Sequence, residues 1–138
     1  MLPYIQLVNI FMQNKQINIS PSQMATYRAT AQLRRQSEKE QIELRYQRAN
    51  VVARQAAQLL KERFGVTEVI LFGSASNPKH FWQHSDIDLA VWGLSESCYY
   101  RALACLLDLD YDFDVDLIMA EEACPTMMAT IINTGVRL

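Results

Sequence analysis

Two aspartates, Asp86 and Asp88, stand on alternate positions where a run of apolar residues begins. Because side chains on a strand alternate between its two faces, we expect both carboxylates to point the same way while Ile87 and Leu89 point into a core. Two residues span about 7 Å along a strand, a separation at which a pair of carboxylates can share two divalent cations. The spacing therefore predicts metal-dependent chemistry on one face of a strand.

A second set of aspartates repeats this alternation near the end of the chain, at Asp108, Asp110, Asp112, Asp114 and Asp116. If the hydrophobic residues between the last of them face the core, Asp114 and Asp116 share a face, and one of them could complete the site. Asp108, Asp110 and Asp112 also fit another interpretation, a solvated edge strand that its charges protect from aggregation.

A Gly-Ser pair, Gly73 and Ser74, follows the apolar residues 66–72 directly. A glycine after a buried strand lets a phosphate approach the backbone, where the following amides and the Ser74 hydroxyl can hold it. Gly-Ser and Asp-x-Asp are each weak signals alone. Together with the strands that carry them and the in-phase aspartate downstream, they form a far more specific pattern.

A long helix is predicted before these motifs, over residues 21–64. Ser20 is a candidate N-cap, Pro21 suits the first helical position, Gln23 can close a capping box, and Gly65 suits the C-terminal end. Apolar residues recur at helical spacing, at Ile42, Tyr46, Ala49, Ala53, Ala56, Leu60 and Phe64. Such a helix would be about 65 Å long, more than the diameter of a domain of about 75 residues, so it must break, fold back or project.

Beyond Gly65 the periodicity changes to short apolar runs at residues 66–72, 87–92 and 113–119, which predict strands. Helical spacing returns over residues 96–107 and again over 125–133. The predicted order is helix, strand, strand, helix, strand, helix, which is typical of a small α/β unit.

Composition points to one soluble domain, since 50% of the 138 residues are hydrophobic and 20% are charged. No run of residues resembles a transmembrane span or a signal peptide, so we expect a cytoplasmic protein without membrane contact. The cysteines, Cys98, Cys105 and Cys124, show no C-x-x-C spacing and are expected to be buried thiols. Residues 1–19 fit a short strand, a loosely docked segment or an added N-terminus.

The net charge of −2 is unevenly distributed along the chain. Residues 1–65 contain ten Lys/Arg and four Asp/Glu, whereas residues 66–138 contain three and eleven. The acidic half suits divalent cations better than nucleic acid, which requires positive charge. Residues 28–48 are rich in Arg, Glu and Gln, so we expect little buried contact there: either a solvated helical arm or a docking arm for a partner subunit or RNA.

From residue 53 onward the chain resembles a minimal nucleotidyltransferase of the polymerase-β-like superfamily. The likeness lies in the segments VILFGS, SDIDLAVWG, FDVDLIMAEE and IINTGVRL. It implies an α/β (α+β) fold, a mixed sheet packed with helices, over residues 49–138. Residues 1–48 would form an N-terminal extension and helical arm.

The same resemblance implies roles for individual residues. Gly73 and Ser74 would bind the phosphates of ATP, and Asp86, Asp88 and Asp116 would hold two Mg²⁺ ions, with Asp114 as the alternative third carboxylate. The chain departs from the family pattern after Ser74, where an arginine and a second glycine are common but Ala75 and Ser76 stand. Lys79 is the candidate for neutralising phosphate charge instead.

Small chains of this superfamily resemble the antitoxin half of HEPN–MNT toxin–antitoxin pairs. The resemblance implies transfer of AMP from ATP to a tyrosine hydroxyl of a cognate HEPN ribonuclease toxin, with any tRNA contact made only through the toxin. Two alternatives stay open: an antitoxin that only binds, with a degenerate transferase site, and a nucleotidyltransferase for a small molecule or an RNA end.

Overall fold

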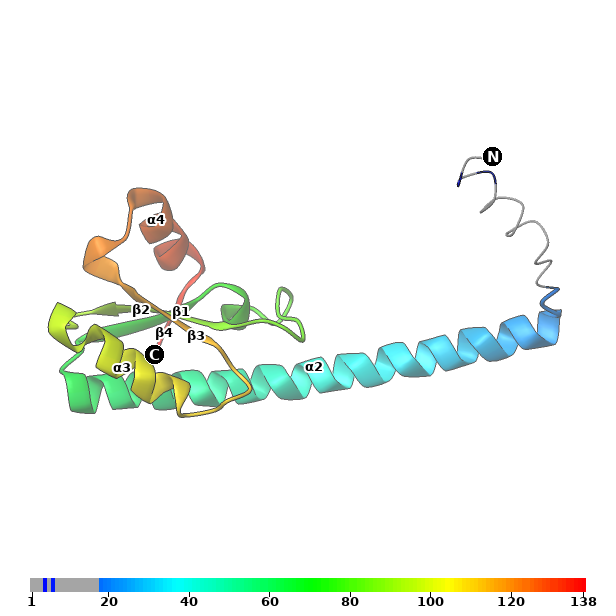
Figure 1. The fold of residues 1–138 in the computed structure, drawn as a ribbon, viewed down its shortest axis with the longest axis horizontal. Helices are drawn as coiled ribbons and strands as arrows, with labels where there is room; N and C mark the ends of the chain where they lie inside the picture. The colour runs from blue at the N-terminus through cyan, green and yellow to red at the C-terminus, as the bar shows by residue number, and fades with distance from the viewer. Residues whose placement is uncertain (1–3, 5, 7–17) are drawn as a thin grey trace. The chain divides into compact units, whose positions relative to one another are not determined.

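The protein forms two compact units, residues 1–37 and residues 38–138, in the computed structural model drawn in Figure 1. The structure describes residues 4, 6 and 18–138. The alternatives for residues 1–19 therefore fall almost wholly outside the described residues. The boundary between an arm and a domain at residues 48 and 49 stays a prediction.

Helix α2 spans Pro21–Phe64, as predicted. In the first unit, its N-terminus is closed by a capping box. The Gln23 N–H donates to Ser20 Oγ at 3.1 Å, and the Ser20 N–H donates to Gln23 Oε1 at 3.0 Å. In the second unit, Gly65 ends the helix with a left-handed φ of 67°.

The second unit contains a four-stranded mixed sheet in the order β3-β2-β1-β4. Its strands are β1 (Glu68–Phe72), β2 (Ile87–Trp92), β3 (Val115–Met119) and β4 (Val136–Arg137). Strand β2 pairs antiparallel with β1 and parallel with β3, and β4 pairs antiparallel with β1. The predicted fold class is confirmed, although β4 was not predicted.

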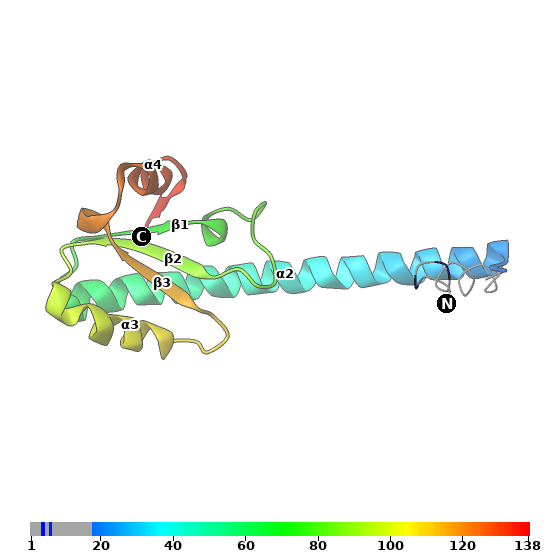
Figure 2. The same cartoon turned by 45° about the horizontal axis from the view of Figure 1, so that its top comes forward.

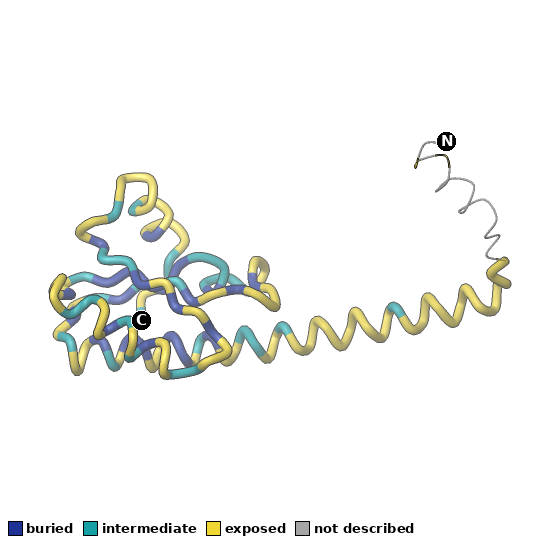
Figure 3. The backbone as a smooth tube through the Cα atoms, in the orientation of Figure 1, coloured by how far each residue is buried: buried dark blue, intermediate teal, exposed yellow. Residues whose placement is uncertain are grey.

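One face of the sheet is covered by α3 (Tyr99–Leu107) and by the part of α2 that belongs to the second unit (Figures 1 and 2). The buried residues of α2 are mostly small: Ala49, Val52, Ala53, Ala56, Ala57 and Leu60. Small side chains let a helix axis approach the strands closely. These helices enclose the side chains of Ile87, Leu89 and Val91 in the main core. Buried residues of the second unit are dark blue in Figure 3.

The opposite face carries only the short helix α4 (Pro125–Thr134), beneath which a smaller cluster forms from Phe72, Ala90 and Ile131. Three 3-10 turns complete the unit: η1 (Ser74–Ser76), η2 (Glu96–Cys98) and η3 (Ala120–Glu122). Part of this second face is therefore left open beside α4.

Three expectations were wrong. Strand β3 begins at Val115 and not at Phe113. The preceding aspartates form a turn, in which the Asp112 N–H donates to Asp110 Oδ1 at 2.9 Å. The interpretation of Asp108, Asp110 and Asp112 as an edge strand is therefore wrong. The thiols are not buried, since Cys98 and Cys105 are partly exposed and Cys124 is exposed.

The third error concerns the polar stretch of α2, residues 28–48. Ile42 and Tyr46 pack against the main core, and Arg45 and Arg48 bond to residues of the later loops. The expectation of little buried contact is thus wrong for residues 42–48. None of the described helices is long and apolar enough to cross a membrane.

Candidate active site

The pairing of three strands brings the predicted site residues together. In the register of β1 and β2, Phe72 lies opposite Asp88, so Gly73 follows at the same end of the sheet. In the register of β2 and β3, Asp88 lies beside Asp116. Because Ile87 and Leu89 enter the main core, Asp88 faces the other side of the sheet, the side that α4 covers in part.

Gly73 meets Asp88 so closely that no side chain fits between them. A Cβ added at Gly73 would overlap the Asp88 carboxylate oxygen Oδ2 and lie 3.2 Å from Cγ. Its φ of 71° is also in the left-handed region, which favours glycine. The loop is held by the Ser76 hydroxyl, which donates to the Gly73 carbonyl at 2.6 Å. Gly73 therefore lies directly against the Asp88 carboxylate. Phosphate binding at Gly73 stays a prediction.

The two other predicted phosphate-binding residues differ in placement. Ser74 is partly exposed at the start of η1, and its hydroxyl makes no hydrogen bond within the described part of the chain. Lys79 lies in the exposed loop before β2 and forms no ion pair with the residues that the structure describes. Only its backbone N–H is bound, to Asn77 Oδ1 at 3.0 Å. The structure therefore places Ser74 beside Gly73 but does not join Lys79 to the carboxylates.

The carboxylates repel one another. The pKa of Asp88 is raised from 3.8 to about 6, mainly by burial and then by the charges of Asp116 and Asp86. No arginine or lysine contributes to this shift in the opposite sense. A bound cation would relieve the repulsion among these carboxylates.

The strand register places Asp116, rather than Asp114, directly beside Asp88. The charge of Asp116 accordingly raises the pKa of Asp88. Asp114 instead takes part through its backbone, whose carbonyl accepts the Ile87 N–H at 3.0 Å. It therefore anchors the start of the parallel pairing.

The donor set suits a hard divalent cation, because Mg²⁺ is bound through carboxylate oxygens and substrate phosphates. Asp86 and Asp116 are both exposed, and Asp88 is half-buried between them. Within the described residues, no three His, Cys, Asp or Glu side chains already converge closely enough to hold a metal. Mg²⁺ or its nucleotide complex would have to draw these side chains together.

The aromatic residues of the loop between β1 and β2 differ in burial. Phe81 is buried against Tyr46, with ring centroids 5.4 Å apart, so it packs beneath the loop. Trp82 is 53% exposed and packs edge-on against His84. His80 and His84 are exposed, as expected for loop residues.

Two residues near the carboxylates were not predicted. The Tyr99 hydroxyl donates to the Leu117 carbonyl at 2.7 Å, and burial followed by the charge of Asp116 raises the pKa of Tyr99. Arg45 of α2 bonds to the carbonyls of Ser85 and Asp112. Neither residue carries a distinctive signal in the sequence, because each lies within a helical pattern.

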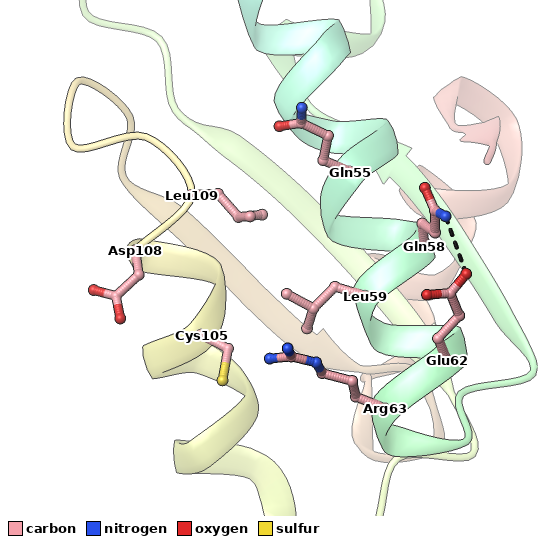
Figure 4. Close-up of a pocket in the computed structure, with 8 residues that line it drawn as sticks. All are labelled: Gln55, Gln58, Leu59, Glu62, Arg63, Cys105, Asp108 and Leu109. Carbon is pink, nitrogen blue, oxygen red and sulfur yellow. Dashed lines mark hydrogen bonds between the residues drawn. The ribbon is translucent and has the colours of Figure 1, made fainter.

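A groove of about 450 Å³ lies elsewhere, between α2 and α3 (Figure 4). Its lining includes Gln55, Leu59 and Arg63 from α2 and Cys105 from α3. The hydrogen bond drawn within it joins Gln58 to Glu62, two neighbours on one helix. The groove belongs to the helices that cover the apolar face. Asp108 lines it, but Asp86, Asp88 and Asp116 do not.

Comparison with known proteins places this arrangement in a family. The sequence profile of the family "Polymerase beta, Nucleotidyltransferase" matches residues 54–138. The chain matches no curated protein at the sequence level.

Several solved structures share the fold. A toxin–antitoxin complex with AMP-PNP is 25% identical, with a TM-score of 0.53 over 62% of this chain and 70% of that chain. A mutant MntA–HepT toxin–antitoxin complex is 28% identical, with a TM-score of 0.52 over 62% and 69%. A complex of the tri-AMPylated Shewanella oneidensis HEPN toxin with its MNT antitoxin is 22% identical, with a TM-score of 0.50 over 64% and 70%.

Proposed function

The chain belongs to the polymerase beta nucleotidyltransferase family, and we propose that it is a magnesium-dependent antitoxin that transfers AMP from ATP to a tyrosine hydroxyl of a cognate HEPN toxin. The observation that carries this proposal is the meeting of Gly73 with Asp88 beside Asp116. It combines a close backbone approach with a group of mutually repelling carboxylates, the two requirements for binding a metal–triphosphate.

Each residue of the group has a part in the proposed reaction. Asp86, Asp88 and Asp116 would hold two Mg²⁺ ions. Bound there, these ions would neutralise the phosphate charge and lower the pKa of the attacking hydroxyl. The Ser74 hydroxyl, which has no hydrogen-bond partner among the described residues, would donate to a phosphate oxygen, and Gly73, which has no side chain, would let that phosphate approach the backbone.

The chemistry is one displacement at phosphorus. The acceptor oxygen forms a bond to the α-phosphorus of ATP, and the bond from that phosphorus to the bridging oxygen breaks. The hydroxyl proton passes to Asp116, an exposed carboxylate on the strand next to β2. Pyrophosphate leaves, and the acceptor keeps AMP as a phosphodiester.

The solved relatives support the choice of substrate and partner. One toxin–antitoxin complex of this fold contains the ATP analogue AMP-PNP, and the S. oneidensis complex contains a tri-AMPylated HEPN toxin. These are properties of those proteins. We take from them the nucleotide, the class of partner and the modification to test in this chain.

Intact-mass measurement of the partner tests the proposal. The cognate HEPN protein is incubated with ATP, Mg²⁺ and this chain, and its mass is expected to increase by one or more AMP units, located on tyrosine by peptide mapping. The doubly substituted chain Asp86→Asn/Asp88→Asn is expected to leave the mass unchanged. An unmodified HEPN protein in a stable complex with the wild-type chain would overturn the transferase assignment.

An antitoxin that only binds is the second candidate, and the loop after Ser74 favours it. Ala75 is fully buried and Ser76 is bonded back to Gly73, so neither supplies the phosphate-binding charge common in the family. In that case, the doubly substituted chain would neutralise the toxin as well as the wild type does.

A further inference from the structure

Arg45 connects the two chain segments that lead into the aspartates. Its Nη2 donates to the Ser85 carbonyl at 3.3 Å and to the Asp112 carbonyl at 3.0 Å. Ser85 directly precedes Asp86, and Asp112 precedes Asp116 by four residues. One side chain of α2 therefore ties the entry of β2 to the entry of β3.

The backbone at Asp86 depends on this connection. The pairing of β2 with β3 begins at Ile87 and Val115, so Asp86 lies before the first paired residue. On its other side, Ser85 is 2% exposed and is fixed by the turn that begins at Trp82 and by Arg45. Asp86 is thus held between the end of the sheet pairing and the residue that Arg45 binds.

The environment of Arg45 is unusual for an arginine on a polar helix. Its guanidinium lies 4.2 Å from the centre of the Phe113 ring, which is 2% exposed. Its Nε is buried without a hydrogen-bond partner, and the described residues include no carboxylate paired with it. Arg45 as a whole is half-buried, and an apolar residue of similar volume often packs as stably as a buried charged group. The two carbonyl bonds are therefore the specific feature of this arginine.

We propose that Arg45 is a positioning residue that sets the separation between Asp86 and Asp88 on one strand and Asp116 on the next, so that all three carboxylates reach one metal–nucleotide ligand. The inference rests on the proposed function for the identity of that ligand. Arg45 acts through the backbone of the two strand entries and does not touch the ligand. Residues that orient metal ligands in this way typically change metal affinity by about 10- to 100-fold when they are removed.

Arg48 provides a matched comparison on the same helix. Its guanidinium is 5.5 Å from the Phe113 ring centre, but its Nη2 bonds to the side chains of Asp110 and Asp112, at 2.6 and 2.9 Å. It therefore contacts only the turn before β3 and makes no bond to the entry of β2. Removing Arg48 disturbs the same region while leaving the connection between the strands in place.

The test is Mn²⁺ binding in the presence of a non-hydrolysable ATP analogue, with free Mn²⁺ followed by electron paramagnetic resonance. Arg45→Gln removes both carbonyl bonds, and Arg45→Met keeps the packing on Phe113 should Arg45→Gln fail to fold. Both variants are expected to bind Mn²⁺ about tenfold or more weakly than the wild type at a temperature where each is folded. Arg48→Gln is expected to stay within about twofold, since exposed ion pairs contribute little.

Three results would overturn the inference: unchanged Mn²⁺ affinity in both Arg45 variants, an equal loss in Arg48→Gln, or no Mn²⁺–nucleotide binding by the wild type. No partner protein takes part in this measurement. A wild-type chain that binds Mn²⁺ and nucleotide but leaves the HEPN protein unmodified would contradict the proposed function. The Mn²⁺ affinities of the Arg45 variants would still test the role of Arg45.

Discussion

The two faces of the sheet differ in chemistry, although side chains of the same strand, β2, lie on both. On β2, Ile87, Leu89 and Val91 are fully buried beneath α2 and α3, where close packing determines what fits. Between them, Asp88 points to the open face beside Asp116, where no arginine or lysine of the described residues offsets the like charges. One face stabilises the fold, and the other contains carboxylates whose repulsion lowers stability.

The largest expected effect is the loss of AMP transfer when the charge of Asp88 on the open face is removed. Asp88→Asn keeps the size of the side chain and removes its charge, so AMP transfer should fall by roughly 100- to 1000-fold. The measurement is the initial rate of transfer at saturating ATP and Mg²⁺. A rate within a fewfold of the wild type would contradict the assignment of Asp88.

Substitution of Leu89, the next residue along β2, should lower stability and leave the transfer rate unchanged. Leu89→Ala leaves a cavity in the main core, and unfolding in denaturant should show a loss of about 3 kcal/mol. The transfer rate per folded molecule should match the wild type. A loss of activity as large as that of Asp88→Asn, in folded protein, would show that the two faces are not independent.

The glycine beside Asp88 gives a third contrast. Gly73→Ala and Gly65→Ala share the strain of a positive φ, because Gly73 has a φ of 71° and Gly65 one of 67°. Only Gly73→Ala adds a Cβ that overlaps the Asp88 carboxylate, whereas a Cβ at Gly65 meets nothing within 4 Å. Nucleotide affinity measured by calorimetry should fall roughly tenfold in Gly73→Ala alone. Equal losses in both variants would indicate backbone strain as the cause.

The smallest effect concerns pH. The pKa of Asp88 is about 6 in the folded chain against 3.8, so the folded state binds this proton more tightly than the unfolded state does. Its contribution to stability is therefore full below pH 4 and is lost as the pH rises through 6. Because the group is only half-buried, we expect a loss of about 1 kcal/mol.

Denaturant unfolding of the metal-free protein at pH 4 and pH 7 measures this loss. Asp88→Asn should remove most of it and be more stable than the wild type at pH 7. A wild type that becomes more stable, relative to Asp88→Asn, between these pH values would contradict the sign.

The sequence predicted the elements whose pattern is long or repeated. The helix Pro21–Phe64 and the strand Ile87–Trp92 have the predicted bounds, because capping residues and alternation are local signals. Strand β4 has only two residues, both exposed, and no periodicity could reveal it. The start of β3 was misplaced because Asp110 forms a turn with its own backbone neighbour, an interaction that competes with strand pairing.

The candidate site followed from alternation as well, since Asp88 and Asp116 occupy in-phase positions that the register then brings together. Arg45 could not be predicted in the same way. It stands in a stretch of Arg, Glu and Gln, and its bonds reach residues 40 and 67 positions further along the chain. Such distant partners become visible only once the strands are paired.

Transfer of label from ATP distinguishes a nucleotidyltransferase from an antitoxin that only binds. The chain is incubated with Mg²⁺, its cognate HEPN protein and ATP labelled at either the α- or the γ-phosphate. We predict that the partner acquires the α-label alone, and that Asp88→Asn abolishes the transfer. Acquisition of the γ-label, or of neither label in a stable complex, would contradict a nucleotidyltransferase active site on the open face of the sheet.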